Sequence, residues 1–298
     1  MAHDHDHSAA AAHRGRLTAV FAITMAVLVV EVVGSALSGS LALLADAGHV
    51  LTDGAGIGLA LLAIWFAARP ATPERTFGYF RVEILAAVVN AVLLFGVAAF
   101  VLVEAWRRLQ EPPEVASGLM LTVALVGLVA NAVSMWLLSR GQAESLNLRG
   151  AYLEVLGDLL GSAAVLVAAA VIALTGFLAA DPIVSAVIGV AILPRTWRLL
   201  REAVDVLLEA TPKGVDMAEV RRHLLEAPGV ADVHDLHAWT ITSGLPVLSA
   251  HVVVDRNAEG DKVLDGLGAC LAGHFDIEHC TFQLERPEHR DHEGVMHP

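Results

Sequence analysis

Three polar residues interrupt a long apolar run in ADAGHVLTD, residues 45–53. Asp46, His49 and Asp53 are spaced i, i+3 and i+7, so in a helix their side chains share one face. A charge at the centre of a bilayer costs roughly 2.5–3.5 kcal/mol on insertion scales, against a net protein stability of ~5–15 kcal/mol. This face is therefore predicted to point into a helix bundle or a wet cavity.

A second pair of acids lies in AYLEVLGDLLGS, where Glu154 and Asp158 are four residues apart. His49 and Asp53 have the same spacing, so two helices together offer four ligand groups, enough for a tetrahedral metal site. Imidazole plus carboxylates suits zinc and neighbouring divalent cations but not copper(I), which prefers sulfur. One buried acid alone would equally well be a packing hydrogen bond, whereas two such pairs favour a metal site.

Other polar residues at membrane depth have less specific interpretations. Asp46 lies one turn from His49, and its role stays open between a helix cap, solvation of the entry and a proton relay. For four others packing or interface roles are favoured: Glu31, Glu83, Asn90 and Asn131.

The composition indicates a membrane protein. The 298 residues are 56% hydrophobic with a mean hydropathy of +0.62, which soluble proteins rarely reach because their surfaces must be polar. The apolar runs are roughly 20 residues long, enough to cross ~30 Å of hydrocarbon as helices. Six membrane-spanning helices are predicted, at residues 17–37, 41–67, 82–106, 119–138, 151–174 and 182–199.

Arginine placement predicts the orientation, because cytoplasmic loops are enriched in basic residues. With the N-terminus in the cytoplasm, only Arg107 and Arg108 fall in outside loops. Ten fall inside: Arg14, Arg16, Arg69, Arg75, Arg81, Arg140, Arg149, Arg195, Arg198 and Arg201. Both termini are then cytoplasmic. Few lysines and many Ala, Val and Arg residues suggest a bacterial inner (plasma) membrane.

Charge and cysteine content exclude some partners. A formal charge of −13 argues against nucleic acid, which needs clustered Lys and Arg. The two cysteines provide no disulfide framework and suit a cytosolic location. The HDHDH stretch near the start is either a weak, flexible metal collector or a solvated tail.

From about residue 201 the chain becomes more polar. Helices are predicted at 216–226 and 261–275, and strands at 230–242, 246–255 and 279–285. This αββαβ order fits a small α+β domain with both helices on one face of the sheet. It would be marginally stable alone and is expected to need a partner chain. The predicted division is a His-rich tail (1–16), a transmembrane domain (17–200), this cytosolic domain (201–286) and a tail (287–298), with both tails disordered.

Three ligand-type residues lie on the predicted strands of this domain. His234, His251 and Glu285 would come together if the strands are neighbours, which would make a second, cytosolic metal site. The structural alternative is a set of solvated strand ends with unrelated polar groups.

Four motifs, in this order, resemble the cation diffusion facilitator family, on its bacterial zinc/cobalt/cadmium-exporting branch: SLALLADAGHVLTD, PERTFGYFRVEILAA, RGAYLEVLGDLLGS and VHDLHAWTI. The resemblance runs from about residue 16 to 286. It implies a homodimeric exporter, not an enzyme, with six transmembrane helices and a cytosolic metallochaperone-like αββαβ domain. Such an exporter exchanges divalent cations for protons and needs no organic cofactor.

The resemblance also assigns ligands. It implies transport ligands at His49, Asp53, Glu154 and Asp158, and regulatory metal at His234, His251 and Glu285. Many zinc transporters of the family have His where this chain has Glu154, so the ionised site carries −3 rather than −2. Zn²⁺ remains the expected substrate, and Co²⁺, Cd²⁺ or Ni²⁺ become better candidates.

A mechanism follows as a hypothesis. Metal ligands must be deprotonated, so protons and metal compete for the same residues, which couples the two flows without ATP. Other functional classes are a membrane-bound metal hydrolase, a proton-coupled transporter of organic solutes and a metal sensor that binds without transport. The sequence shows no nucleophile or general base for a hydrolase outside the ligand set, and neither a sensor nor a solute transporter requires two intramembrane ligand pairs.

Overall fold

The computed structural model describes residues 4–67, 69–139 and 146–289. Within these ranges, the side chains of residues 4–17, 52–53, 55–64, 67 and 146–151 lie outside the description. The chain divides into two compact units. One comprises Met1–Leu61 and Val89–Leu200, and the other comprises Leu62–Val88 and Arg201–Pro298.

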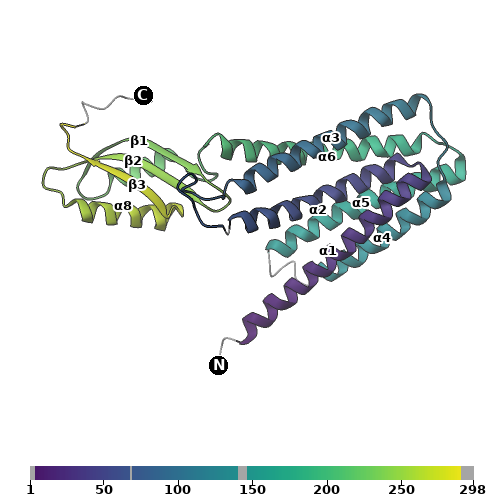
Figure 1. Ribbon diagram of the computed structural model, residues 1–298, viewed down its shortest axis with the longest axis horizontal. Helices are drawn as coiled ribbons and strands as arrows, with labels where there is room; N and C mark the ends of the chain where they lie inside the picture. The colour runs from purple at the N-terminus through teal and green to yellow at the C-terminus, as the bar shows by residue number, and fades with distance from the viewer. Residues whose placement is uncertain (1–3, 68, 140–145, 290–298) are drawn as a thin grey trace. The chain divides into compact units, whose positions relative to one another are not determined.

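Long helices build the first unit (Figure 1). They are α1 (Asp4–Ser38), α2 (Leu41–Ala67), α3 (Val82–Gln110), α4 (Ser117–Ser139), α5 (Leu146–Thr175) and α6 (Ala180–Leu207). Among the described residues, five segments are long and apolar enough to cross a membrane, and α2 adds the shorter apolar stretch Leu41–Leu51. The prediction of a disordered N-terminal tail is wrong where it overlaps α1, because that helix already begins at Asp4.

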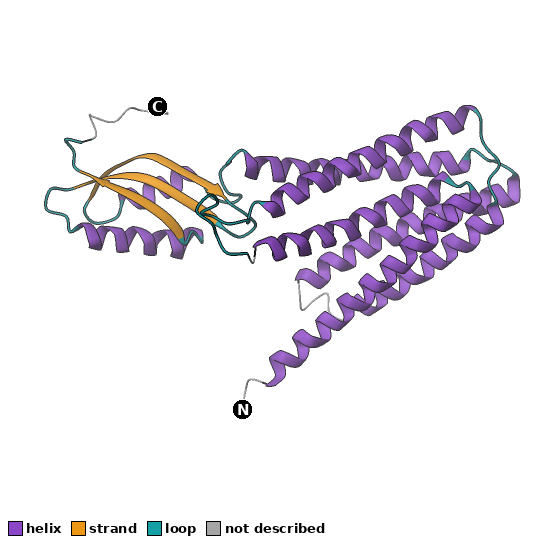
Figure 2. Ribbon diagram, in the orientation of Figure 1, coloured by secondary structure: helices purple, strands orange, loops and turns teal. Residues whose placement is uncertain are grey.

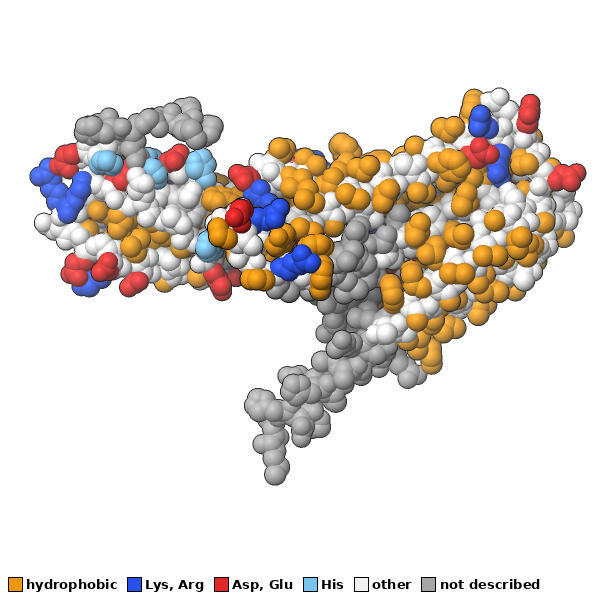
Figure 3. Space-filling view, viewed as in Figure 1, with side chains coloured by type: hydrophobic (Ala, Val, Ile, Leu, Met, Phe, Trp, Pro, Cys, Tyr) orange, Lys and Arg blue, Asp and Glu red, His pale blue; other side chains and the backbone are white. Residues whose placement is uncertain are grey.

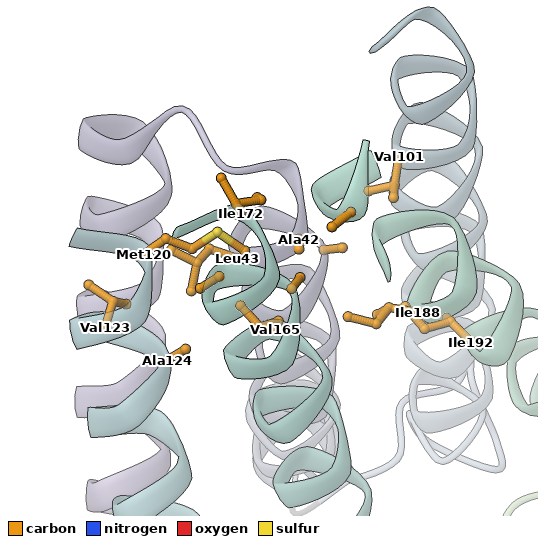
Figure 4. Packing of buried hydrophobic residues seen from close by; sticks show 14 of the residues in the cluster. Ala42, Leu43, Val101, Met120, Val123, Ala124, Val165, Ile172, Ile188 and Ile192 are labelled. Carbon is orange, nitrogen blue, oxygen red and sulfur yellow. The ribbon is translucent and has the colours of Figure 1, made fainter. Parts of the chain in front are cut away.

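Small and branched apolar side chains fill the interior between these helices (Figure 4). Leu43 of α2, Met120 of α4 and Val165 of α5 are completely buried there. By contrast, large apolar residues such as Leu174 are exposed, and Figure 3 shows hydrophobic side chains over the visible face of the helices. An apolar exterior of this kind suits helices that are surrounded by lipid.

The start of α2 is capped by a side chain from α6. Asp181 is completely buried and accepts hydrogen bonds from Ser40 Oγ (2.5 Å) and from the backbone N–H groups of Leu41 (2.9 Å) and Ala42 (3.1 Å). The Arg108 guanidinium of α3 lies 3.8 Å from the same carboxylate. The first N–H groups of a helix have no intrahelical partner. The Asp181 carboxylate accepts two of these N–H groups at the start of α2, and it links α2 to α6 and α3.

The second unit contains the predicted αββαβ domain (Figure 2). Its elements are α7 (Met217–Leu225), β1 (Val230–Thr240), β2 (Pro246–Val254), α8 (Gly260–Phe275) and β3 (His279–Glu285). The strand order is β1-β2-β3, with β1 antiparallel and β3 parallel to β2. The expected fold class, a helical membrane protein with a C-terminal αββαβ domain, is confirmed.

Both helices of this domain cover one face of the sheet. Leu224 of α7 and Leu267 of α8 are buried in one cluster with Leu248 and Val252 of β2. Successive side chains of a strand point to opposite faces, so His251, between Ala250 and Val252, lies on the face away from the helices. That face is where the predicted cytosolic ligands can meet.

The connection between α2 and α3 belongs to this second unit. Arg81 donates to Glu209 at 2.8 Å, and the hydroxyls of Thr242 and Ser243 donate to Glu83 at the start of α3. Glu83 therefore joins the start of α3 to the loop between β1 and β2.

Candidate metal centres

Helices α2 and α5 bring two of the four predicted transport ligands together. His49 Nε2 lies 3.7 Å from Asp158 Oδ1, and their side chains are 19% and 4% exposed. Both residues lie on largely buried faces of their helices, as the sequence predicted for them. Nitrogen and carboxylate oxygen at this separation, in a largely buried setting, form the start of a cation site.

The other two predicted transport ligands are Asp53 and Glu154. The Asp53 side chain lies outside the described residues, and its position stays a prediction. Glu154 is half exposed and forms an ion pair with Arg195 of α6, with Nη2 2.7 Å from Oε1. The structure therefore does not place Glu154 with His49 and Asp158, and a site that includes all of them requires this ion pair to open.

A buried polar cluster lies beside the His49–Asp158 pair. Asp46 accepts a hydrogen bond from Ser162 Oγ at 3.1 Å, and Ser162 accepts one from Asn131 Nδ2 at 3.2 Å. Glu31 of α1 is also buried. A Cβ at Gly161 would collide with Asp46, so only glycine lets the carboxyl approach α5 this closely. The cluster places buried polar side chains within one helical turn of His49.

The cytosolic prediction corresponds to a compact cluster on the open face of the sheet. His234 Nε2 lies 3.1 Å from Glu285 Oε2, and His251 Nδ1 lies 2.8 Å from Glu285 Oε1. His234 pairs directly with His251 in the β1–β2 ladder, while Glu285 pairs with Val253, two residues further along β2. One ligand atom from each residue lies within 4.8 Å of the others, which is close enough for one metal ion to bridge them.

Sequence reasoning missed a fourth residue at this cluster, the acid Asp235. The register slips by one residue between His234 and His237, and Asp235 there has φ of +46°. Such a bulge redirects a side chain, and Asp235 Oδ2 lies 3.8 Å from His251 Nε2. The hydrogen bond from His237 lowers the pKa of Asp235, so this exposed carboxylate stays ionised beside the histidines.

A multi-span helical protein with a cytosolic-type α+β domain, and with cation-ligand clusters in both parts, defines a metal-handling membrane protein. The family description "Cation efflux transmembrane domain" matches residues 17–208, and "Cation efflux protein, cytoplasmic domain" matches residues 212–287. The chain therefore belongs to the cation diffusion facilitator family. It is an integral membrane cation efflux transporter and not an enzyme, as expected.

Curated relatives cover nearly the whole chain. The metal cation efflux system protein CzcD of Cupriavidus metallidurans is 48% identical over 284 residues, 95% of this chain and 89% of the relative. The zinc transporter ZitB of Escherichia coli is 44% identical over 96% of this chain and 93% of the relative. A protein of Bacillus velezensis named cadmium, cobalt and zinc/H(+)-K(+) antiporter is 36% identical over 99% of this chain and 96% of the relative.

The geometry of the open-face cluster predicts a measurable loss of bound metal. Replacing His251 with Ala removes one nitrogen ligand, so zinc affinity of this site should fall at least ~10-fold, and the full chain should bind about one ion fewer at low micromolar zinc. Equilibrium dialysis of the detergent-purified chain measures both quantities. His279→Ala is the matched control, because His279 is an exposed strand residue outside the cluster. An unchanged binding curve for His251→Ala would contradict the site.

Proposed function

We propose that this protein exports zinc from the cytoplasm in exchange for protons, using His49, Asp53, Glu154 and Asp158 as transport ligands. The observation that carries the proposal is the approach of His49 on α2 and Asp158 on α5 to 3.7 Å, inside a unit whose helices are long and apolar enough to cross a membrane. Ionisable residues at membrane depth are expensive unless they serve a cation or proton path.

The relatives support the choice of ions. Zinc occurs in the names of the ZitB and Bacillus proteins, cadmium and cobalt in the latter, and the latter is named as an antiporter that moves protons. Zn²⁺ is therefore the proposed main substrate, with Co²⁺, Cd²⁺ and Ni²⁺ as further candidates because Glu154 adds a carboxylate to the site.

Proton exchange follows from the ligand types. A carboxylate or imidazole binds metal only after it has lost its proton, so each arriving cation displaces protons from the same groups. Asp46 and Glu31 are buried near the site but are not among the four proposed ligands. This position suits a role in accepting protons and passing them on. Protons that return from the outer side release the metal there.

Arg195 completes this exchange. Its guanidinium pairs with Glu154 at 2.7 Å and gives the acid a positive partner. When zinc takes Glu154 as a ligand, Arg195 is released. One positive charge replaces the other, and the acid at this depth is never without compensation.

The finer cellular arrangement is proposed with the function. The protein forms a homodimer through its cytosolic domain and lies in a bacterial inner (plasma) membrane with both termini in the cytoplasm. Metal at His234, His251 and Glu285 reports cytosolic zinc to the transport unit, because ion binding favours one of two domain arrangements.

A sensor without transport is the second candidate, favoured by the cytosolic cluster alone. Metal flux into proteoliposomes that carry a metal dye and a pH dye separates the two. Zinc entry with opposite proton movement supports the exchanger, and saturable binding without flux under any gradient supports the sensor.

The transport site is tested by removing Asp158. Asp158→Ala deletes a buried ligand, so zinc-dependent proton flux should fall more than ~100-fold while the protein still inserts and elutes as a folded species. Asp53→Ala should behave in the same way. Glu111→Ala, at an exposed loop acid, should transport normally. Normal transport by Asp158→Ala would disprove the ligand assignment.

The ion pair predicts the effect of Arg195→Gln. Both partners are half exposed, at 53% and 45%, so the pair is worth only ~0.2–1 kcal/mol. Without this competitor, KM for zinc should fall by about 1.4- to five-fold, which is that free energy expressed as a ratio. Arg195→Lys keeps the positive charge, so its KM for zinc should stay close to the wild-type value. An increase in KM for Arg195→Gln would refute competition.

Selectivity is predicted to depend on Glu154. Glu154→His exchanges a carboxylate for an imidazole and lowers the charge of the site, which should raise zinc uptake relative to cadmium and cobalt. Parallel flux assays with each ion give the ratios. Glu154→Asp, which keeps charge and ligand type, should leave the ratios near wild type, and identical ratios in all three proteins would move selectivity elsewhere.

A further inference from the structure

A second set of metal-ligand side chains lies in the helical layer of the cytosolic domain. His223 comes from α7, while Cys270 and His274 come from α8. One ligand atom from each lies within 4.8 Å of the others. Neither the transport ligands nor the open-face cluster includes any of these residues.

Helix geometry explains why they meet. Cys270 and His274 are four residues apart, so they stack on one face of α8, and α7 packs against that helix. The imidazoles of His223 and His274 have centroids 4.9 Å apart at 83°, and Cys270 Sγ lies 3.9 Å from His223 Nδ1. The three side chains thus converge from two helices on one point.

The orientation of His274 suits a ligand. Its Nδ1 lies 3.1 Å from the Cys270 carbonyl oxygen, which can only accept, so Nδ1 carries the proton and Nε2 keeps its lone pair. Metal-binding histidines usually donate their other ring N–H to a carbonyl or carboxylate in this way.

The spacing also suits a tetrahedral ion. Zinc–sulfur and zinc–nitrogen bonds of about 2.3 and 2.0–2.1 Å place neighbouring ligand atoms roughly 3.3–3.6 Å apart. The Sγ–Nδ1 separation of 3.9 Å is only slightly longer, and all three side chains are at least partly exposed, so small side-chain rotations close the gap.

We propose that His223, Cys270 and His274 form a separate binding site for a thiophilic divalent cation, zinc or cadmium. Two imidazoles and a thiolate are the donor set that selects such ions over magnesium or calcium. Water would complete the coordination. This site is independent of transport, because it needs only the cytosolic domain.

The site has a structural consequence. The open-face cluster lies on the other side of the sheet from α7 and α8, so the domain carries cation ligands on both faces. An ion held by His223, Cys270 and His274 links α7 to α8 across the helical layer, and it stabilises the folded domain more the more tightly it binds.

Cobalt spectroscopy tests the proposal on the full chain in detergent with a non-coordinating reductant. Co²⁺ bound to a thiolate has a sulfur-to-metal charge-transfer band in the near ultraviolet that nitrogen and oxygen ligands lack. Neither the transport ligands nor the open-face cluster contains sulfur, so the band reports a cysteine ligand. The expected result is a band that grows to saturation with cobalt and disappears when zinc or cadmium is added.

Matched variants assign the band. Cys270→Ser should abolish it, and His274→Gln should weaken cobalt binding at least ~10-fold in the same titration. Cys280→Ser is the control for the second cysteine, which packs against the core of the domain, and it should keep the band. Circular dichroism verifies that each variant is folded, and cobalt uptake at the remaining sites verifies that it still binds metal.

Two outcomes would overturn the proposal. One is a folded wild-type chain that binds cobalt without any charge-transfer band. The other is a band that survives Cys270→Ser and disappears in Cys280→Ser. Neither outcome bears on zinc flux, so the transport proposal stands or falls separately.

Discussion

A carboxylate inside a membrane needs a hydrogen-bond donor or a cation beside it, and the helical unit is arranged to satisfy this requirement. Asp158 lies beside His49, Asp46 accepts from Ser162, and Glu154 pairs with Arg195. Each of these three acids on α2 and α5 has a partner on another helix. The helices are therefore positioned by the same groups that can receive a cation or a proton.

Asp181 shows the requirement in its purely structural form. It takes two backbone N–H groups and one hydroxyl at the start of α2, and its charge faces Arg108. Nothing is left for a cation to displace, so this acid fixes the end of α2 on which the inward face of the helix depends. The difference between Asp181 and Asp158 is one of partners: several fixed donors make an anchor, while an imidazole leaves an exchangeable site.

How much the sequence predicts depends on whether a signal is local. Helical spacing found the inward-facing His49 and Asp158, and strand alternation found His234, His251 and Glu285, since both periods are set by backbone geometry. The sequence did not predict that Asp235 joins this cluster, because a bulge arises only when a strand pairs with another strand. The Arg195 contact joins α5 and α6, which no pattern within one helix reveals. Cys270 and His274 had the same i, i+4 spacing, yet their third partner, His223, is 47 residues from Cys270 and meets it only in the fold.

The proposed transport site and the proposed Cys270 site differ in whether they contain a sulfur ligand, and this difference matches their functions. A transport site must bind its ion firmly enough to load and weakly enough to release, which favours nitrogen and oxygen ligands that protons can displace. A thiolate holds zinc or cadmium more tightly and suits an ion that stays. In this chain both cysteines lie in the cytosolic domain, and the ligands assigned to the membrane contain none. Because sulfur ligands occur only in the cytosolic domain, a tightly bound metal stays out of the transport path. The Cys270 site is therefore suited to stabilising the domain rather than to moving ions.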